Sequence, residues 1–296
     1  LQAILALVCA IIRCCCCCYL STVTLILTEQ GRCRSSCCLS SFSFFRVWIS
    51  RDRATRRIRH GLNPAGAEHS DAVWGVELHA FHPLLASASA DKSVILWDLQ
   101  SFTSLATLAF PASTAAPDPP DPDPVPTSLR FLSTEASKLL VSYSNSSLAI
   151  FDVPTASPTL LFSSSPASSA SSSRPAVSQP SALAVHPSMP LALSAHDDGS
   201  LRFLDITAGS CLHSLPAHRA PATSVAVDPA GLYAASAAAD GALAVWDLRQ
   251  RVLLSEMRAH SRVFGQGATC VAYHPTRSMI ASGGCDALVA LHVQSA

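Results

Sequence analysis

A turn residue followed six positions later by a large side chain recurs five times along the chain and constrains its fold more than any other feature. The five pairs are Asp91 and Trp97, Asn145 and Phe151, Asp198 and Leu204, Asp240 and Trp246, and Asp286 and His292. The turn positions are 54, 53, 42 and 46 residues apart. Self-similarity at such a period indicates a repeat architecture, in which each unit buries its apolar surface against its neighbours.

Residues 218–259 form the clearest repeat, with four short apolar runs separated by turn-forming residues. Asp228-Pro229 and Asp240-Gly241 supply the backbone angles that tight turns need. The runs therefore predict four antiparallel strands and an all-β fold. The pattern from His218 to Trp246-Asp247 resembles a WD40 repeat, which forms one blade of a β-propeller.

The same pattern predicts five blades, at about residues 69–110, 127–162, 181–217, 218–259 and 260–293. Two insertions, residues 111–126 and 163–180, are rich in proline or serine and are expected to be disordered. The last blade has no predicted fourth strand. We therefore expect an incomplete, open ring whose end strands present unpaired edges.

The resemblance to WD40 proteins implies a buried hydrogen-bonded tetrad in each well-formed blade. In that tetrad the aspartate accepts from the imidazole, and the serine hydroxyl accepts the indole N–H. The complete sets are His69, Ser87, Asp91 and Trp97, and His218, Ser236, Asp240 and Trp246; degenerate members are Asn145, Phe151, Asp198, Leu204, His260, Ser282 and Asp286, with His292 in place of tryptophan. These residues are expected to be structural.

The sequence predicts no catalytic residue, no cofactor and no metal site. It contains no G-x-S-x-G, P-loop or H-E-x-x-H motif, and the histidines and aspartates of the repeats are assigned to the tetrads. Residues 61–296 hold eleven Lys and Arg against eighteen Asp and Glu, which argues against nucleic-acid binding. Only Cys211, Cys270 and Cys285 lie in the repeats, so no disulfide framework is expected there and a cytoplasmic location is predicted.

Residues 1–60 differ in composition from the repeats, with nine of the twelve cysteines and nine arginines. Residues 1–28 are apolar except for Arg13 and a few hydroxyl residues, a length that can cross a bilayer as a helical anchor. Membrane contact is therefore predicted only through this stretch. Arg13 near its middle argues against an anchor. A fragment edge or a mis-joined reading frame is therefore the favoured interpretation of residues 1–60, and a true anchor and a secretory signal are the alternatives.

Three consecutive strings, AVHPSMPLALSAHDDGSLRFLD, AHRAPATSVAVDPAGLYAASAAADGALAVWDL and AHSRVFGQGATCVAYHPTRSMIASGGCDALVALHV, resemble the carboxy-terminal blades of the striatin family. HSDAVWGVELH at the front of the repeats and the tryptophan-poor second blade extend that resemblance to residues 69–293. It implies a non-enzymatic scaffold that joins protein phosphatase 2A subunits to Ste20-type kinases. The family's coiled coil and its calmodulin-binding and caveolin-binding segments are not recognised in this sequence, which leaves calmodulin in doubt as a partner. The alternative is a generic WD40 adaptor of a ubiquitin-ligase or trafficking complex.

Overall fold

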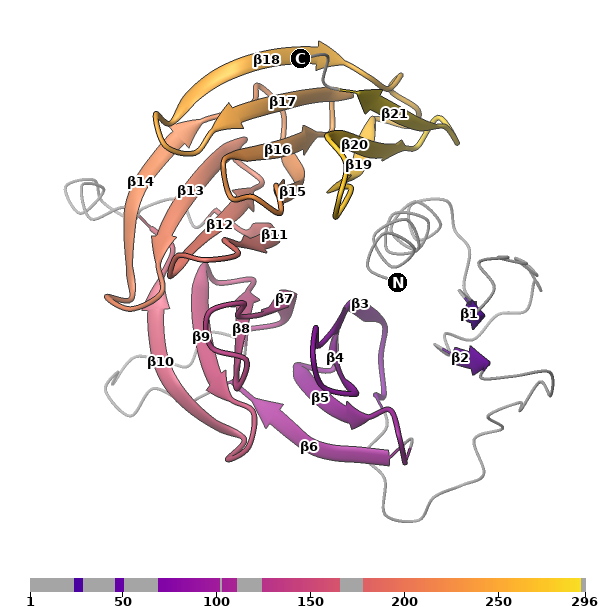
Figure 1. Cartoon of the computed structure of the whole chain (residues 1–296), viewed down its shortest axis with the longest axis vertical. Helices are drawn as coiled ribbons and strands as arrows, with labels where there is room; N and C mark the ends of the chain where they lie inside the picture. Colours follow the sequence, from indigo (N-terminus) through magenta and orange to yellow (C-terminus); the bar gives the residue numbers. More distant parts are fainter. Residues whose placement is uncertain are drawn as a thin grey trace.

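Five antiparallel sheets follow one another around an open arc in a computed structural model of the chain (Figure 1). The structure describes residues 24–28, 46–50, 69–101, 103–110, 124–165 and 178–293. The innermost strands of consecutive sheets pack side by side along the arc, whereas the first and last sheets stand apart across its opening (Figure 1). The prediction of an all-β propeller with five blades in an open ring is confirmed.

Each of the first four blades is a four-stranded meander, and the fifth has three strands. Blade 1 contains β3 (Val73–Leu78), β4 (Leu84–Ser89), β5 (Ser93–Asp98) and β6 (Thr103–Ala109); blade 2 contains β7 (Pro126–Phe131), β8 (Lys138–Tyr143), β9 (Ser147–Asp152) and β10 (Ser157–Ser163). Blade 3 contains β11 (Pro180–Val185), β12 (Leu191–His196), β13 (Ser200–Asp205) and β14 (Ser210–Pro216); blade 4 contains β15 (Ala222–Val227), β16 (Tyr233–Ala238), β17 (Ala242–Asp247) and β18 (Val252–Arg258). Blade 5 contains β19 (Ala268–Tyr273), β20 (Met279–Gly284) and β21 (Val289–Val293).

A register shift occurs at the same place in the innermost strand of every blade. It lies between Val73 and Gly75, Pro126 and Ser128, Pro180 and Ala182, Ala222 and Ser224, and Ala268 and Cys270. Such a bulge increases the local twist of a strand pair. Its repetition gives each blade the same twist, so that successive blades stack in the same way.

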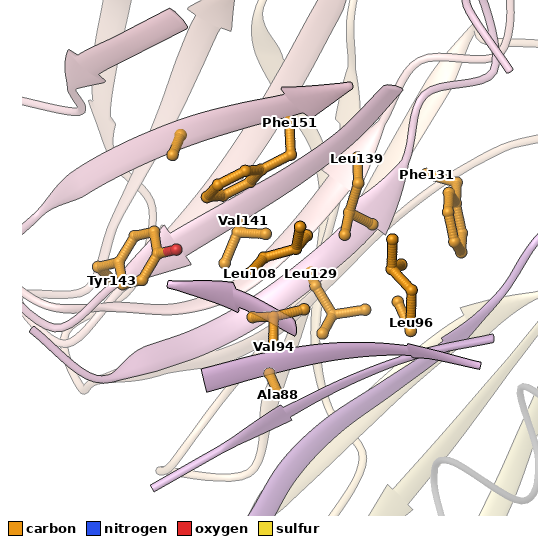
Figure 2. Packing of buried hydrophobic residues seen from close by; sticks show 12 residues of the cluster. Ala88, Val94, Leu96, Leu108, Leu129, Phe131, Leu139, Val141, Tyr143 and Phe151 are labelled. Atoms are coloured by element: carbon orange, nitrogen blue, oxygen red, sulfur yellow. The ribbon is translucent and has the colours of Figure 1, made fainter. Parts of the chain in front are cut away.

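The hydrophobic core lies between blades. Val94 and Leu96 of blade 1 pack with Leu129, Val141 and Phe151 of blade 2 in one cluster (Figure 2). Three further clusters join blade 2 to blade 3, blade 3 to blade 4, and blade 4 to blade 5. Each sheet therefore buries its apolar faces by contact with its neighbours, as the repeat pattern predicts.

Two short strands lie outside the blades, β1 (Thr24–Thr28) and β2 (Arg46–Ser50), and they pair in parallel. Thr24–Thr28 is the end of the predicted helical anchor, and it is extended. The rest of that prediction, residues 1–23, lies outside the described residues. In the part of the chain that the structure describes, no helix is long and apolar enough to span a bilayer.

The two predicted insertions also lie mostly outside the described residues, at 111–123 and 166–177. Where they meet the described chain, they differ slightly from the predicted boundaries. Pro126 and Pro180, the last residues of the predicted insertions, are the first residues of β7 and β11. Proline is tolerated at the first position of a strand, where its missing N–H breaks no ladder.

We expect Gly241→Ala to destabilise the fold far more than Gly265→Ala, although both glycines have positive φ, +87° and +82°. A Cβ on Gly241 would lie 2.0 Å from the carbonyl oxygen of His260, whereas a Cβ on Gly265 meets nothing within 4 Å. The backbone strain alone costs about 1 kcal/mol, and the clash in the turn adds roughly 1–3 kcal/mol. Chemical denaturation of both variants measures the difference, and equal losses would contradict this packing of blade 4 on the loop before blade 5.

Candidate functional site

Blade 1 contains a closed polar network of four side chains. His69 lies before β3, Ser87 on β4, Asp91 in the β4–β5 turn and Trp97 on β5. The Nε2 atom of His69 is 2.7 Å from the Ser87 Oγ, and its Nδ1 is 2.9 Å from an Asp91 carboxylate oxygen. The Trp97 indole donates to the same serine oxygen at 2.8 Å. One assignment of protons satisfies every group: Nδ1–H donates to the carboxylate, and the Ser87 hydroxyl donates to Nε2.

The carboxylate of Asp91 is held in its charged form. Burial by itself would raise the pKa of Asp91, but hydrogen bonds from Ser93, His69 and Ser70 lower that pKa to about 2. The Ser93 hydroxyl donates at 2.6 Å and the Ser70 amide at 3.0 Å. These donors fix the orientation in which the carboxylate meets the imidazole.

Blade 4 forms only part of the expected network. The Nε2 of His218 is 2.7 Å from the Ser236 Oγ, and the Trp246 indole donates to that oxygen at 2.9 Å. The Nδ1 of His218 is buried and has no hydrogen-bond partner, so the expected bond to Asp240 is not formed. Burial lowers the pKa of His218 despite the opposing charge of Asp240.

Blades 1 and 4 differ at the position two residues after the turn aspartate. Ser93, two residues after Asp91, holds the carboxylate of blade 1 through its hydroxyl. The equivalent residue after Asp240 is Ala242, which offers only its backbone N–H, at 3.0 Å. A hydroxyl at this position is not required for the contact, because Leu288 follows Asp286 at the same spacing in blade 5 and His260 still meets that carboxylate.

The polar network of blade 5 contains more hydrogen bonds than its sequence indicates. The Nδ1 of His260 lies 3.0 Å from Asp286, and its Nε2 lies 2.9 Å from the Ser282 hydroxyl. His292 takes the place of tryptophan, with its Nε2 3.1 Å from the same hydroxyl. Since an imidazole N–H donates as an indole N–H does, the network keeps four members.

Blade 3 replaces the tetrad with a different network. Leu204 stands where tryptophan would lie and is fully buried. His196, two residues after Ser194 on β12, places its Nε2 2.9 Å from that serine's hydroxyl. Arg202 forms an ion pair with Asp198 at 2.9 Å. Burial and the charge of Arg202 lower the pKa of His196 to about 4, so its imidazole is neutral at pH 7.

Blade 2 shows no tetrad among its described residues. Asn145 accepts a hydrogen bond from the Ser147 amide at 3.1 Å and so closes its own turn. Phe151 is 1% exposed and packs in the cluster with Tyr143. Apolar packing replaces the polar network in this blade.

Four polar side chains that form such contacts were not predicted from the sequence: His196, Arg202, His79 and His186. His196 could have been found from strand periodicity, because residues two apart share one face of a strand. His79 and His186 follow the innermost strands of blades 1 and 3, and each accepts two backbone N–H bonds at its Nδ1. Their Nε2 atoms bind carbonyl oxygens in the next blade, Ala136 at 2.7 Å and Gly231 at 2.9 Å.

The Asp–His–Ser order of these networks resembles a catalytic triad, but its environment favours a structural role. Ser87 and Ser236 are 3% and 0% exposed, and each hydroxyl oxygen already accepts an indole N–H. Both oxygens are therefore shielded from solvent in the folded blades. Across the described residues, no group of three His, Cys, Asp or Glu side chains could hold a metal ion.

Comparison with known proteins agrees with this geometry. Residues 65–98, 209–247 and 251–292 match the WD40 family, described as WD domain, G-beta repeat. Striatin-4 of Homo sapiens is 34% identical over 225 residues, which is 76% of this chain and 28% of that protein. Striatin of Rattus norvegicus is 35% identical over 76% of this chain and 27% of that protein, and striatin-3 of Bos taurus is 31% identical over the same shares.

These matches define the chain as a WD40-repeat protein. Its repeat region is that of the striatin family, as the sequence strings predict. The chain spans about a quarter of the length of the curated relatives it matches.

We expect Asp91→Ala to cost more stability than Asp240→Ala. Asp91 accepts from His69, Ser70 and Ser93, so its loss leaves several donors unpaired, at about 2–3 kcal/mol. Asp240 accepts from the Ala242 amide, and its loss should cost about 1 kcal/mol. Denaturant midpoints of the two variants test the order, and a larger loss for Asp240→Ala would contradict the geometry of both turns.

The pH dependence of unfolding should report His196. Its pKa is lowered from 6.5 to about 4 in the folded state, so the unfolded chain accepts a proton that the folded chain refuses. The neutral imidazole therefore costs the folded state nothing above pH 6.5, and the free energy of unfolding decreases as the pH falls toward 4. The decrease between pH 7 and 5 is about 2 kcal/mol. In the variant His196→Gln, the free energy of unfolding should fall by about 2 kcal/mol less than in the unmodified protein between pH 7 and 5. An identical pH dependence in both proteins would contradict a neutral, buried imidazole.

Proposed function

We propose that this chain is a non-enzymatic protein-interaction scaffold that binds partners through one rim of its propeller. The observation that carries the proposal is a set of large apolar side chains exposed on equivalent loops. Phe81, Met189 and Leu232 are 79%, 47% and 54% exposed, in the loops that join the first and second strands of blades 1, 3 and 4. Because every blade runs in the same direction, these loops lie on the same rim of the arc.

Hydrogen bonds to the two loop histidines fix the backbone that carries these apolar side chains. The Phe81 amide donates to His79 Nδ1 at 3.0 Å, and the Met189 amide donates to His186 Nδ1 at 3.0 Å. Leu232 follows Gly231, whose carbonyl accepts from His186. An apolar anchor on a fixed backbone loses little entropy when a partner covers it, so such residues contribute strongly to binding.

The similarity to striatins supports particular partners for this scaffold. We infer a striatin-like regulatory subunit, in the cytoplasm, that brings protein phosphatase 2A subunits together with Ste20-type kinases. Calmodulin is left out, because in the family its binding belongs to a segment outside the repeats. The alternative is a WD40 adaptor in a ubiquitin-ligase or trafficking complex.

Affinity purification of the tagged chain from cells, followed by mass spectrometry, tests this function. We expect recovery of phosphatase 2A subunits and Ste20-type kinases, and at least tenfold less of them with the triple variant Phe81→Ala, Met189→Ala and Leu232→Ala. Phe264→Ala is the matched control, because Phe264 is fully exposed in the loop between β18 and β19 at the opposite rim.

Two outcomes would contradict the proposal. Recovery of a ubiquitin-ligase or trafficking complex in place of the phosphatase and kinases would favour the alternative adaptor. Unchanged recovery with the triple variant would show that partners bind elsewhere on the arc.

A further inference from the structure

The loop between blades 4 and 5 is longer than the loops that precede blades 1 and 4. The first strand begins four residues after the tetrad histidine in blades 1 and 4, and eight residues after His260 in blade 5. The extra residues form a short hairpin, in which the amides of Val263 and Gln266 each donate to the other residue's carbonyl, at 2.8 and 3.1 Å. Phe264 and Gly265 are the two residues of its turn.

The base of this hairpin is fixed to the turns of both neighbouring blades. The Ser261 amide donates to the Asp286 carboxylate at 3.0 Å, and the Cys285 amide donates to the Gly267 carbonyl at 2.9 Å. On the other side, a Cβ on Gly267 would lie 2.3 Å from the backbone nitrogen of Gly241, so the loop also packs against the turn of blade 4. The hairpin is therefore held between two blades that the structure describes.

The tip of the hairpin presents an aromatic side chain that no described residue covers. Phe264 is 102% exposed, and a Cβ on Gly265 would meet nothing within 4 Å. The φ angles of these two residues are +51° and +82°, as in a type I′ turn. Such turns favour Asn-Gly, and a bulky side chain at positive φ is strained. Phe264 is thus held in a strained and exposed position, and it adds nothing to the core.

The strain at Phe264 is not required by the repeat. The other five described non-glycine residues with positive φ lie in turns that recur from blade to blade and that contain glycine in blade 3 or blade 4. Lys92, Ser146 and Ala287 take the position of Gly199 and Gly241, and Ala156 and Arg251 take the position of Gly209. Phe264 lies in a loop that the other junctions do not repeat. Backbone strain of this kind, outside the needs of the fold, points to a functional contact.

Arginines flank the tip, and the hairpin contains no acidic residue. Arg258 and Arg262 are exposed, and the Nη2 of Arg262 donates to the Gly265 carbonyl at 3.4 Å, which places a guanidinium beside the tip. No Asp or Glu occurs in residues 257–267. The hairpin is therefore basic, although residues 61–296 hold eleven Lys and Arg against eighteen Asp and Glu.

We propose that this hairpin docks a second protein by inserting Phe264 into an apolar pocket, whose rim carries Asp or Glu side chains that pair with Arg262 and Arg258. An aromatic side chain on a fixed loop fills a pocket at little entropic cost, and aromatic and arginine side chains contribute strongly to binding. Guanidinium groups bind carboxylates with two parallel hydrogen bonds, which fixes the orientation of the partner.

The charge of the repeat region favours a protein over an anionic membrane as the occupant. A bilayer would meet the acidic arc as a whole and repel it, whereas a protein pocket contacts the basic hairpin alone. The hairpin lies on the rim opposite to Phe81, so this docking site does not rest on the proposed phosphatase and kinase partners.

Site-specific photo-cross-linking in cells tests the docking site in the full chain, with p-benzoylphenylalanine in place of Phe264. We expect one abundant cross-linked protein, whose cross-linked peptide lines an apolar pocket bordered by Asp or Glu. The cross-link should fall at least tenfold with Arg262→Glu. Arg249→Glu is the matched control and should leave it unchanged, because Arg249 is exposed in the loop between β17 and β18, at the other rim. The absence of a cross-linked protein, a cross-link that Arg262→Glu does not reduce, or cross-linking to lipid overturns the proposal.

Chemical denaturation tests the strained tip without any partner. Phe264→Asn should raise the denaturant midpoint above that of the unmodified protein, because asparagine adopts positive φ more readily than phenylalanine. Phe264→Ala is the matched comparison and should give a lower midpoint than Phe264→Asn, because alanine lacks that preference. A midpoint that Phe264→Asn lowers would show that Phe264 packs within the fold, and it would overturn the proposal.

Discussion

The internal structure of blades 1, 4 and 5 depends on hydrogen bonds to a buried serine hydroxyl on the second strand of each blade. In blade 1 the Ser87 hydroxyl bridges a histidine from the loop before the blade and a tryptophan from its third strand. The same histidine also contacts Asp91 in the turn and Ser93 on the third strand. Leaving any one partner out would strand a buried donor or acceptor, which costs more than the bond itself contributes.

The network matters because no blade has a core of its own. Apolar side chains of one sheet are covered by those of the next, so the angle between sheets must be the same at each junction. The repeated bulge in the innermost strand and the loop histidines of blades 1 and 3 help to set that angle. The resulting rigid arc presents its loops at fixed positions, which is what an interaction scaffold requires.

The sequence predicts the fold well because the turn chemistry repeats. The six-residue offset from turn to large side chain locates the third strand of every blade. The strands of the arc lie within the predicted blades except that Pro126, Ser163 and Pro180 fall one residue outside, and β1 and β2 lie apart from them. It predicts the polar networks less well, because they depend on orientation. The bond between His218 and Asp240 is absent, although the same residue types are in contact in blades 1 and 5. His196 contacts Ser194 two residues away on the same strand, a pairing that the offset from the turn does not predict.

Hydrogen exchange of the tryptophan indole N–H groups, followed by NMR, tests the central claim most directly. Trp97 and Trp246 donate to buried serines, while Trp74 is 58% exposed. We predict that the indole N–H groups of Trp97 and Trp246 exchange orders of magnitude more slowly than that of Trp74, because they open only when the blade does. Equal exchange rates for all three would contradict the claim that hydrogen bonds to the buried serines hold the strands of each blade together.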